Sequence, residues 1–346
     1  MVVTGLVALA GCATEPPATA ATGSTGTAGP SRSPSPAASP ASATPAVAFS
    51  GLIEPGAGMG PIYALLASAR HTVDLVMYEL EDIQAEQLLA GDATHGVDVR
   101  VVLNSAYTGS ENDAAYSYLQ GHRVHVRWAS SLYALTHQKT LVVDGLVAAI
   151  MTLNWTSRYY SDTRDVAVID RIPADVAAIE ATFDADYAGT RITPAPGADL
   201  VWSPTTSEPA LLSLINGAEH DLFVENEEMS SREITDALAA AARRGVNVEI
   251  CMTNSSSWSS EFATLVGAGV HLSVYAPDAP LYIHAKVLVR DPGAADQEAF
   301  VGSQNFSTES LLYNRELGIV LNGGSLVGQL VTTIQDDYAG ATPWTG

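Results

Sequence analysis

A short polar motif occurs twice in this chain, and its two copies contain the only two lysines among the 346 residues. The first copy begins at His137 and reads HQKTLVVD, and the second begins at His284 and reads HAKVLVRD. In each copy the lysine stands two positions after the histidine and five before an aspartate. Coincidence at both lysines is far rarer than the usual false match of a short motif, so we interpret the stretches as two copies of one functional unit.

A second polar segment follows each copy at a distance. It reads MTLNWT at residues 151–156 and GSQNFS at residues 302–307. An acidic residue stands eleven positions beyond the asparagine of each segment. The asparagines and their acids are Asn154 with Asp165, and Asn305 with Glu316.

The duplication extends over the chain from residue 48 onward. Corresponding positions are 146 to 151 residues apart, and both halves end on the tetrapeptide DYAG. The matched segments are two apolar strands (72–79 and 220–225), two helices (84–94 and 233–244) and two further strands (96–103 and 245–250). This alternation predicts an α/β fold of two pseudo-symmetric repeats, each a mostly parallel sheet flanked by helices, packed as an intramolecular dimer. We therefore expect a monomer with an internal pseudo-dimer.

Composition divides the chain into four predicted parts. Residues 1–12 end in LAGC, which resembles a bacterial lipobox with Cys12 as the lipidated residue. Residues 13–47 consist almost entirely of Ala, Pro, Ser, Thr and Gly, a composition typical of a disordered linker. The repeats then occupy residues 48–196 and 197–346. Residues 1–11 contain no Lys or Arg, unlike most export leaders, so either the leader starts upstream or the resemblance is accidental.

The series H-x-K-x4-D, G-S-x-N and distal acid resembles the phospholipase D superfamily, also called HKD phosphodiesterases. The first copy departs from it, since Met151 and Thr152 replace the glycine and the serine. The resemblance implies two repeats around one phosphate pocket, a phosphohistidine intermediate, and no metal or cofactor. It also implies that His137 is the nucleophile and His284 the general acid.

The residue types fit phosphodiester chemistry independently. One neutral imidazole attacks phosphorus while a protonated one donates to the leaving alcohol, and cations and neutral donors hold the phosphate oxygens. On a strand, positions i and i+2 share a face, so each histidine lies beside its lysine. The predicted catalytic residues are His137, Lys139, Asn154, Asp165, His284, Lys286, Asn305 and Glu316, with Asp165 and Glu316 orienting the imidazoles and Thr152 and Ser303 donating to the phosphate.

Asp144 and Asp291 stand seven positions after the histidines, which places them on the opposite face of such a strand. We therefore predict that they form structural hydrogen bonds. A metal site is a poor interpretation of the motif, because lysine is a rare ligand and no cluster of His, Cys or Asp has zinc spacing.

Charge bears on the substrate. The formal net charge is −22, and residues 1–47 contribute only Glu15 and Arg32, so the repeats carry the excess. An acidic surface repels polyanions, which argues against nucleic acid as a partner. The leading hypothesis is an exported phospholipase D-type enzyme acting on phospholipid at a membrane surface, either lipid-anchored to the outer face of the bacterial cell membrane or secreted. The alternatives are an HKD-type nuclease and a binding module whose site has decayed.

Overall fold

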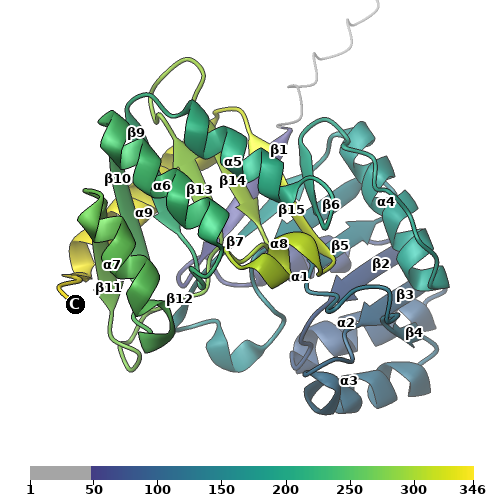
Figure 1. Cartoon of the computed structure of the whole chain (residues 1–346). Coiled ribbons are helices and arrows are strands. Elements are labelled where there is room, and N and C mark those ends of the chain that lie inside the picture. The colour runs from purple at the N-terminus through teal and green to yellow at the C-terminus, as the bar shows by residue number, and fades with distance from the viewer. Residues whose placement is uncertain (1–47) are drawn as a thin grey trace, which may run out of the picture. The chain divides into compact units, whose positions relative to one another are not determined.

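Two eight-stranded sheets form the framework of the computed structural model, which describes residues 48–346 (Figure 1). The predicted leader, Cys12 and the predicted linker over residues 13–47 lie outside the described residues. The first half contains, in chain order, β1 (Phe49–Glu54), α1 (Gly60–Leu66), β2 (Thr72–Met77), α2 (Ile83–Thr94), β3 (Asp98–Leu103), α3 (Gly109–Gly121), β4 (His125–Trp128), β5 (Lys139–Val143), β6 (Val147–Met151), a 3₁₀ turn (Ser157–Tyr159), β7 (Thr163–Asp170) and α4 (Pro173–Ala188).

The second half repeats this series and adds short elements. It contains β8 (Leu200–Ser203), α5 (Ser207–Gly217), β9 (Asp221–Glu225), α6 (Arg232–Arg244), β10 (Asn247–Thr253), a 3₁₀ turn (Ser256–Trp258), α7 (Ser259–Gly267), β11 (His271–Tyr275), β12 (Tyr282–Ile283), β13 (Val287–Arg290), β14 (Glu298–Gly302), α8 (Thr308–Leu312), β15 (Glu316–Leu321), α9 (Ser325–Gly340) and β16 (Thr342–Pro343).

The strand order confirms the two α/β repeats. It runs β1-β7-β6-β5-β2-β3-β4 in one sheet and β8-β15-β14-β13-β9-β10-β11 in the other, where β16 extends the edge. The sheets are mixed rather than mostly parallel, which corrects the prediction. Within each half, only β2-β3-β4 and β9-β10-β11 are parallel ladders. Long helices connect those strands, whereas β5, β6 and β7, like β13, β14 and β15, follow one another without a long crossover helix and pair antiparallel.

Local sequence signals explain where the predicted helices begin and end. The Asp82 side chain caps α2 by accepting hydrogen bonds from the backbone N–H groups of Gln84 and Ala85. Ser231 caps α6 in the same way, and this helix ends at Gly245, whose φ of 97° suits the left-handed position after a helix. The predicted helices over 84–94 and 233–244 are therefore confirmed to within one residue at each end.

Asp144 and Asp291 have the predicted structural role. Both adopt a positive φ, 54° and 45°, at the turn that follows β5 and β13. Asp144 accepts hydrogen bonds from the backbone N–H groups of residues 70–72, and Asp291 accepts them from those of residues 219–221. Each aspartate thus ties its turn to the start of the neighbouring central strand.

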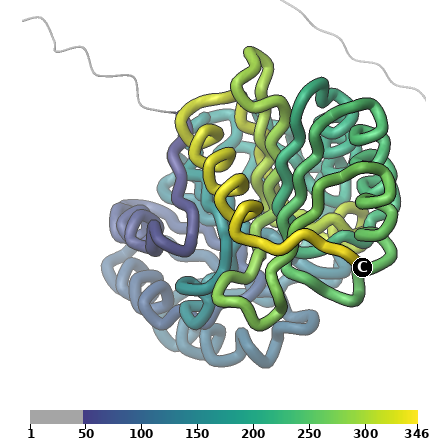
Figure 2. The backbone as a smooth tube through the Cα atoms, turned by 90° about the vertical axis from the view of Figure 1, so that its left-hand side faces the viewer, coloured from purple at the N-terminus to yellow at the C-terminus, as the bar shows by residue number. Residues whose placement is uncertain are grey.

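The helices and sheets form layers with a shared core in the middle. Contacts place α4 against the first sheet and α9 against the second, and Figure 2 shows α9 running beside β1 of the first half. A buried apolar cluster joins the facing sides of the two sheets with α4 and α9. It includes Val142, Ile150, Val168, Ile179, Trp202, Val287, Val301, Ile319 and Leu330. The halves therefore pack through a common interior, and their motifs lie along that interface.

Candidate active site

Backbone pairing across the interface positions the two histidines. The segment before β5 runs beside the start of β15, so that the His137 N–H donates to the Arg315 carbonyl at 2.9 Å. Likewise β12 pairs with β7, and the His284 N–H donates to the Arg164 carbonyl at 3.2 Å. The prediction that both histidines lie on strands is wrong, because each precedes its strand. Backbone hydrogen bonds to the opposite half hold both of them instead. Each histidine consequently lies next to an acid of the other repeat.

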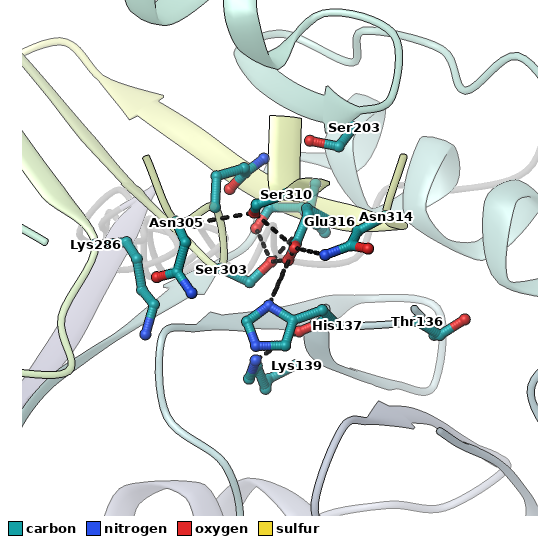
Figure 3. A network of polar contacts seen from close by, with 12 residues as sticks. Thr136, His137, Lys139, Ser203, Lys286, Ser303, Asn305, Ser310, Asn314 and Glu316 are labelled. Carbon is teal, nitrogen blue, oxygen red and sulfur yellow. Dashed lines mark hydrogen bonds and ion pairs between the residues drawn. The ribbon is translucent and has the colours of Figure 1, made fainter. Parts of the chain in front are cut away.

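Glu316 holds the His137 imidazole. The Nδ1 atom of His137 lies 2.9 Å from Glu316 Oε2, and both side chains are buried. Three further donors fix the carboxylate: the Ser303 hydroxyl at 2.6 Å, the Ser310 hydroxyl at 2.7 Å and the Asn314 amide at 3.2 Å (Figure 3). Burial alone would raise the pKa of Glu316, but His137, Lys139 and the Ser303 hydroxyl hold it below its usual range. The ionised carboxylate leaves the other ring nitrogen of His137 free for chemistry.

The second pair is built the same way with fewer partners. His284 Nδ1 lies 2.8 Å from Asp165 Oδ1, and the Thr152 hydroxyl donates to the same oxygen at 2.5 Å. The buried Asp165 also has a pKa below its usual range, because His284 and Lys286 outweigh the effect of burial. The predicted orienting carboxylates are therefore both in contact with an imidazole, and each comes from the opposite repeat.

Thr152 and Ser303 occupy a different place from the predicted one. Both are fully buried, and their hydroxyls donate to Asp165 and Glu316 rather than lining the cavity. The same hydroxyls accept backbone N–H bonds from Val166 and Leu317. These contacts support a role in fixing the carboxylates. The exchange of serine for threonine in the first copy preserves them.

Met151 takes the place of the family's glycine without disturbing the first half-site. A side chain at the equivalent Gly302 would collide with the Gln304 side chain at 2.3 Å and with the Gly318 backbone at 2.6 Å. In the first half, Met151 instead pairs with Ala167 in the ladder, and its sulfur accepts the Trp155 indole N–H at 3.4 Å. The substitution is therefore a packing difference between the repeats.

The two lysines lie in unequal surroundings. Both are buried, and each ammonium donates to the backbone carbonyl of its own motif's histidine. The Lys139 ammonium lies 4.9 Å from the centre of the Tyr78 ring, and burial lowers its pKa to about 7. The Lys286 ammonium forms an ion pair with Glu227 at 2.9 Å. Each half-site therefore contains a buried lysine, and of the two lysines only Lys286 forms an ion pair with a carboxylate of the described residues.

A cavity of about 550 Å³ lies where the motifs meet. Both histidines, both motif asparagines and Asp165 line it. The Oδ1 atoms of Asn154 and Asn305 are buried without a hydrogen-bond partner among residues 48–346. The remaining lining includes Tyr78, Glu79, Tyr159, Tyr160, Asp162, Glu227, Glu228 and Tyr282. One cavity therefore receives the polar groups of both repeats.

The environment of His137 favours its neutral form. Burial lowers the pKa of this imidazole, the Glu316 carboxylate partly opposes that effect, and Lys139 reinforces it. A neutral imidazole is the form in which a histidine acts as a nucleophile. His284 differs in its contacts, since its Nε2 atom lies 3.5 Å from the Glu227 carboxylate.

Glu227 and Tyr78 line the cavity but lie outside the repeated motifs. They occupy corresponding positions with unlike side chains, so repetition in the sequence does not reveal them. Their positions carry a signal, since Tyr78 follows β2 and Glu227 follows β9, at the carboxyl edge where α/β sheets bind ligands.

Comparisons with known proteins agree with this geometry. The family described as "Cardiolipin synthase, PLD-like domain" matches residues 62–187 and again residues 211–338. Cardiolipin synthase A of Yersinia pseudotuberculosis and that of Yersinia pestis are each 26% identical to the chain over 323 residues, covering 78% of it. The chain spans 64% of the length of these relatives.

Two solved structures share the fold. Phosphatidylserine synthase of Haemophilus influenzae has a TM-score of 0.65 at 10% identity, over 86% of this chain and 87% of that one. Polyphosphate kinase of Porphyromonas gingivalis has a TM-score of 0.64 at 14% identity, over 84% of this chain and 50% of that one. Because the family's domain matches both repeats and the two motifs meet in one cavity, this chain belongs to the phospholipase D superfamily.

Proposed function

We propose that the chain is a phospholipase D-type phosphodiesterase that hydrolyses a glycerophospholipid to phosphatidate and a free alcohol. The observation that carries the proposal is the crossed arrangement: two imidazoles line one cavity, and each is oriented through Nδ1 by a carboxylate of the opposite repeat. Such a pair supplies a nucleophile and a proton donor to the same phosphate.

The proposed reaction has two steps. His137 Nε2 forms a bond to phosphorus while the phosphorus–oxygen bond to the head-group alcohol breaks, and the leaving oxygen takes a proton from His284 Nε2. Water then attacks the phosphohistidine, His284 accepts its proton, and phosphatidate leaves as His137 is regenerated. Lys139, Lys286 and the amides of Asn154 and Asn305 stabilise the charge on the non-bridging oxygens. In this scheme the positive charge comes from the protein, and no metal is required.

Two observations favour lipid over nucleic acid as the substrate. The curated relatives are cardiolipin synthases, and one structural neighbour is a phosphatidylserine synthase. The net charge of −22 opposes the approach of a polyanion. We therefore retain a nuclease activity only as an alternative outcome of the experiment.

A second candidate function is phosphatidyl transfer. The phosphohistidine does not distinguish water from another hydroxyl, and the names of the relatives describe synthases. In this reaction an acceptor alcohol attacks in place of water and gives up its proton to His284. The balance between transfer and hydrolysis then depends on whether an alcohol competes with water in the cavity.

We further propose a monomer that acts at a membrane surface, exported and either lipid-anchored through Cys12 or secreted. Within residues 48–346, none of the helices combines the length and the apolar character that a bilayer crossing requires. Labelling of cells with a radioactive fatty acid, comparing the natural chain with Cys12→Ala, tests the anchor.

A side-by-side assay tests the activity. Residues 48–346 are incubated in EDTA with phosphatidylcholine, phosphatidylglycerol, bis-p-nitrophenyl phosphate or single-stranded DNA, with and without added glycerol. We expect phosphatidate and free head group with the lipids, and intact DNA. If the lipids incubated with glycerol yield a phosphatidyl-glycerol product in place of phosphatidate, the enzyme is a transferase. Cleaved DNA with intact lipid reverses the proposal, and loss of turnover in EDTA rejects metal independence.

A further inference from the structure

The two half-sites differ in charge at one pair of corresponding positions, Tyr78 and Glu227. The correspondence follows from the contacts on either side of them. Before these positions, the backbone N–H of Thr72 donates to Asp144, and that of Asp221 donates to Asp291. After them, Leu80 forms a β-bridge with Trp155, and Met229 forms one with Phe306. Each pair of positions is separated by 149 residues, like Tyr78 and Glu227.

In the first half-site the position holds an aromatic ring. Tyr78 packs edge-on against the His137 ring, with 4.5 Å between the centres, and the Lys139 ammonium lies over the same tyrosine. Among residues 48–346, Lys139 has no carboxylate within ion-pair distance. The Lys139 ammonium is buried and donates to the His137 backbone carbonyl, so within the described residues it has no counterpart of the ion pair between Lys286 and Glu227.

In the second half-site the position holds a carboxylate that contacts every group proposed to bind phosphate there. Glu227 Oε2 lies 2.9 Å from the Lys286 ammonium, 3.5 Å from His284 Nε2 and 3.5 Å from the Asn305 amide nitrogen. The Tyr282 hydroxyl donates to the other oxygen at 3.1 Å. One oxygen of Glu227 therefore has the ligands expected of a non-bridging phosphate oxygen.

We propose that Glu227 is a specificity-determining residue: its carboxylate occupies the anion position of the second half-site, and a substrate phosphate has to displace it. The carboxylate is ionised, because Lys286 and His284 more than offset the effect of burial and hold the pKa of Glu227 well below its usual range. A phosphate bound beside it meets like charge, while Lys286 is already paired.

The position of Glu227 permits this displacement. Its side chain lines the cavity and is 23% exposed, so rotation about its side-chain bonds moves the carboxylate into the open part of the cavity. The backbone can stay in place during this rotation. The expected consequence is that the cavity disfavours additional negative charge, so a phosphodiester, which carries a single charge, binds in preference to a phosphomonoester or free phosphate.

Phosphate titration tests the proposal without any assay of lipid turnover. Inorganic phosphate is titrated calorimetrically into the natural protein, E227Q and E233Q at constant ionic strength; Glu233 is an exposed acid on α6 outside the cavity. Removal of one adjacent charge in a partly solvated site should tighten phosphate binding about tenfold in E227Q. E233Q should bind like the natural protein. Equal or weaker phosphate binding by E227Q overturns the proposal, because that result is expected if Glu227 only holds the Lys286 side chain in position.

A second measurement uses the natural protein, in case E227Q does not fold. Crystals soaked in tungstate, a phosphate-like oxyanion, should show the Glu227 carboxylate rotated away from Lys286 and the oxyanion bound to Lys286 and Asn305. An oxyanion bound in the cavity with the Lys286 to Glu227 ion pair intact contradicts the proposal. Either result stands whether or not lipid is the substrate, so a failure of the proposed function is distinguishable from a failure of this inference.

Discussion

Each imidazole of the cavity takes its orienting carboxylate from the opposite repeat, so the residue pairs cross. His137 binds Glu316, and His284 binds Asp165. The cause is the backbone pairing of each histidine with the residue that directly precedes the acid, Arg315 or Arg164. A carboxylate at this place fixes the tautomer and stabilises a proton on the ring.

The crossed pairs predict which histidine responds to each acid. Glu316→Gln should reduce kcat by about 100-fold or more, because the His137 ring loses the charge that fixes its tautomer. In nitrogen-labelled protein, the ring signals of His137 should shift while those of His284 stay in place, and D165N should give the reverse. Glu233→Gln is the control for removal of a carboxylate. Shifted His284 signals in E316Q would show that the pairs are not crossed in solution.

The pKa shifts predict a rate maximum on the acidic side of neutral. The rate constant kcat/KM should rise with pH as His137 loses its proton, and burial lowers that pKa below the ordinary value of 6.5. It should fall as Lys139 loses its charge, at a pKa of about 7. Lys139→Arg keeps the charge at high pH, so its falling limb should move upward although its rate is lower. A falling limb that stays in place would assign it to another group.

Repetition made the single residues of the site predictable. His137, Lys139, Asn154 and their counterparts in the second half stood out because they recur at fixed spacing. Spacing along a chain does not show which half an acid reaches, so the crossing required the fold. Sequence spacing also does not show that Thr152 and Ser303 bind carboxylates, because a hydroxyl can donate a hydrogen bond to a carboxylate or to a phosphate.

At the scale of elements, apolar runs located the strands but did not give their directions. The predicted strand over 72–79 and its partner over 220–225 are present as β2 and β9. The antiparallel half of each sheet was missed because a buried strand is apolar in either orientation. What decides the direction is the connection, here the tight turn at Asp144 and, in the second half, the longer loop that begins at Asp291.

The junction of β7 and α4 predicts a pH-dependent stability. Asp170 and Asp175 are both fully buried there, and burial together with the neighbouring Asp175 raises the pKa of Asp170 to about 7. A raised carboxyl pKa stabilises the fold at low pH, and this stabilisation is lost as the pH rises from about 4 toward 7. Asp170→Asn keeps a neutral side chain, so it should increase the free energy of unfolding at pH 8 by about 1 to 3 kcal/mol.

Urea titrations of the natural protein and D170N at pH 5 and pH 8 measure this effect. The two proteins should differ little at pH 5 and most at pH 8. Lower stability of D170N at pH 8 would show that Asp170 is ionised and specifically bound.

At the scale of the whole molecule, the halves share both their interior and their chemistry. The apolar cluster between the sheets draws on β5, β6 and β7 as well as on β13, β14 and β15. Separation would expose this surface to water and leave each histidine without its carboxylate. Neither repeat is therefore expected to function alone.

A cut between the repeats tests this dependence. A protease site inserted after Thr193, in the exposed connection between α4 and β8, allows the folded protein to be nicked. The nicked protein should retain most of its activity, because no contact of the cavity is lost. After separation in denaturant, each fragment should be inactive on refolding, and a mixture should regain activity. Turnover by a single fragment would mean that one repeat assembles a complete site from two copies of itself.

The crossing of the residue pairs also sets the moment at which a newly made chain becomes chemically competent. While Glu316 is still inside the ribosome, His137 has already emerged but lacks the partner that fixes its tautomer. In the half-made protein the site is therefore incomplete, and both histidine–carboxylate pairs are present only when the final strands reach the earlier half.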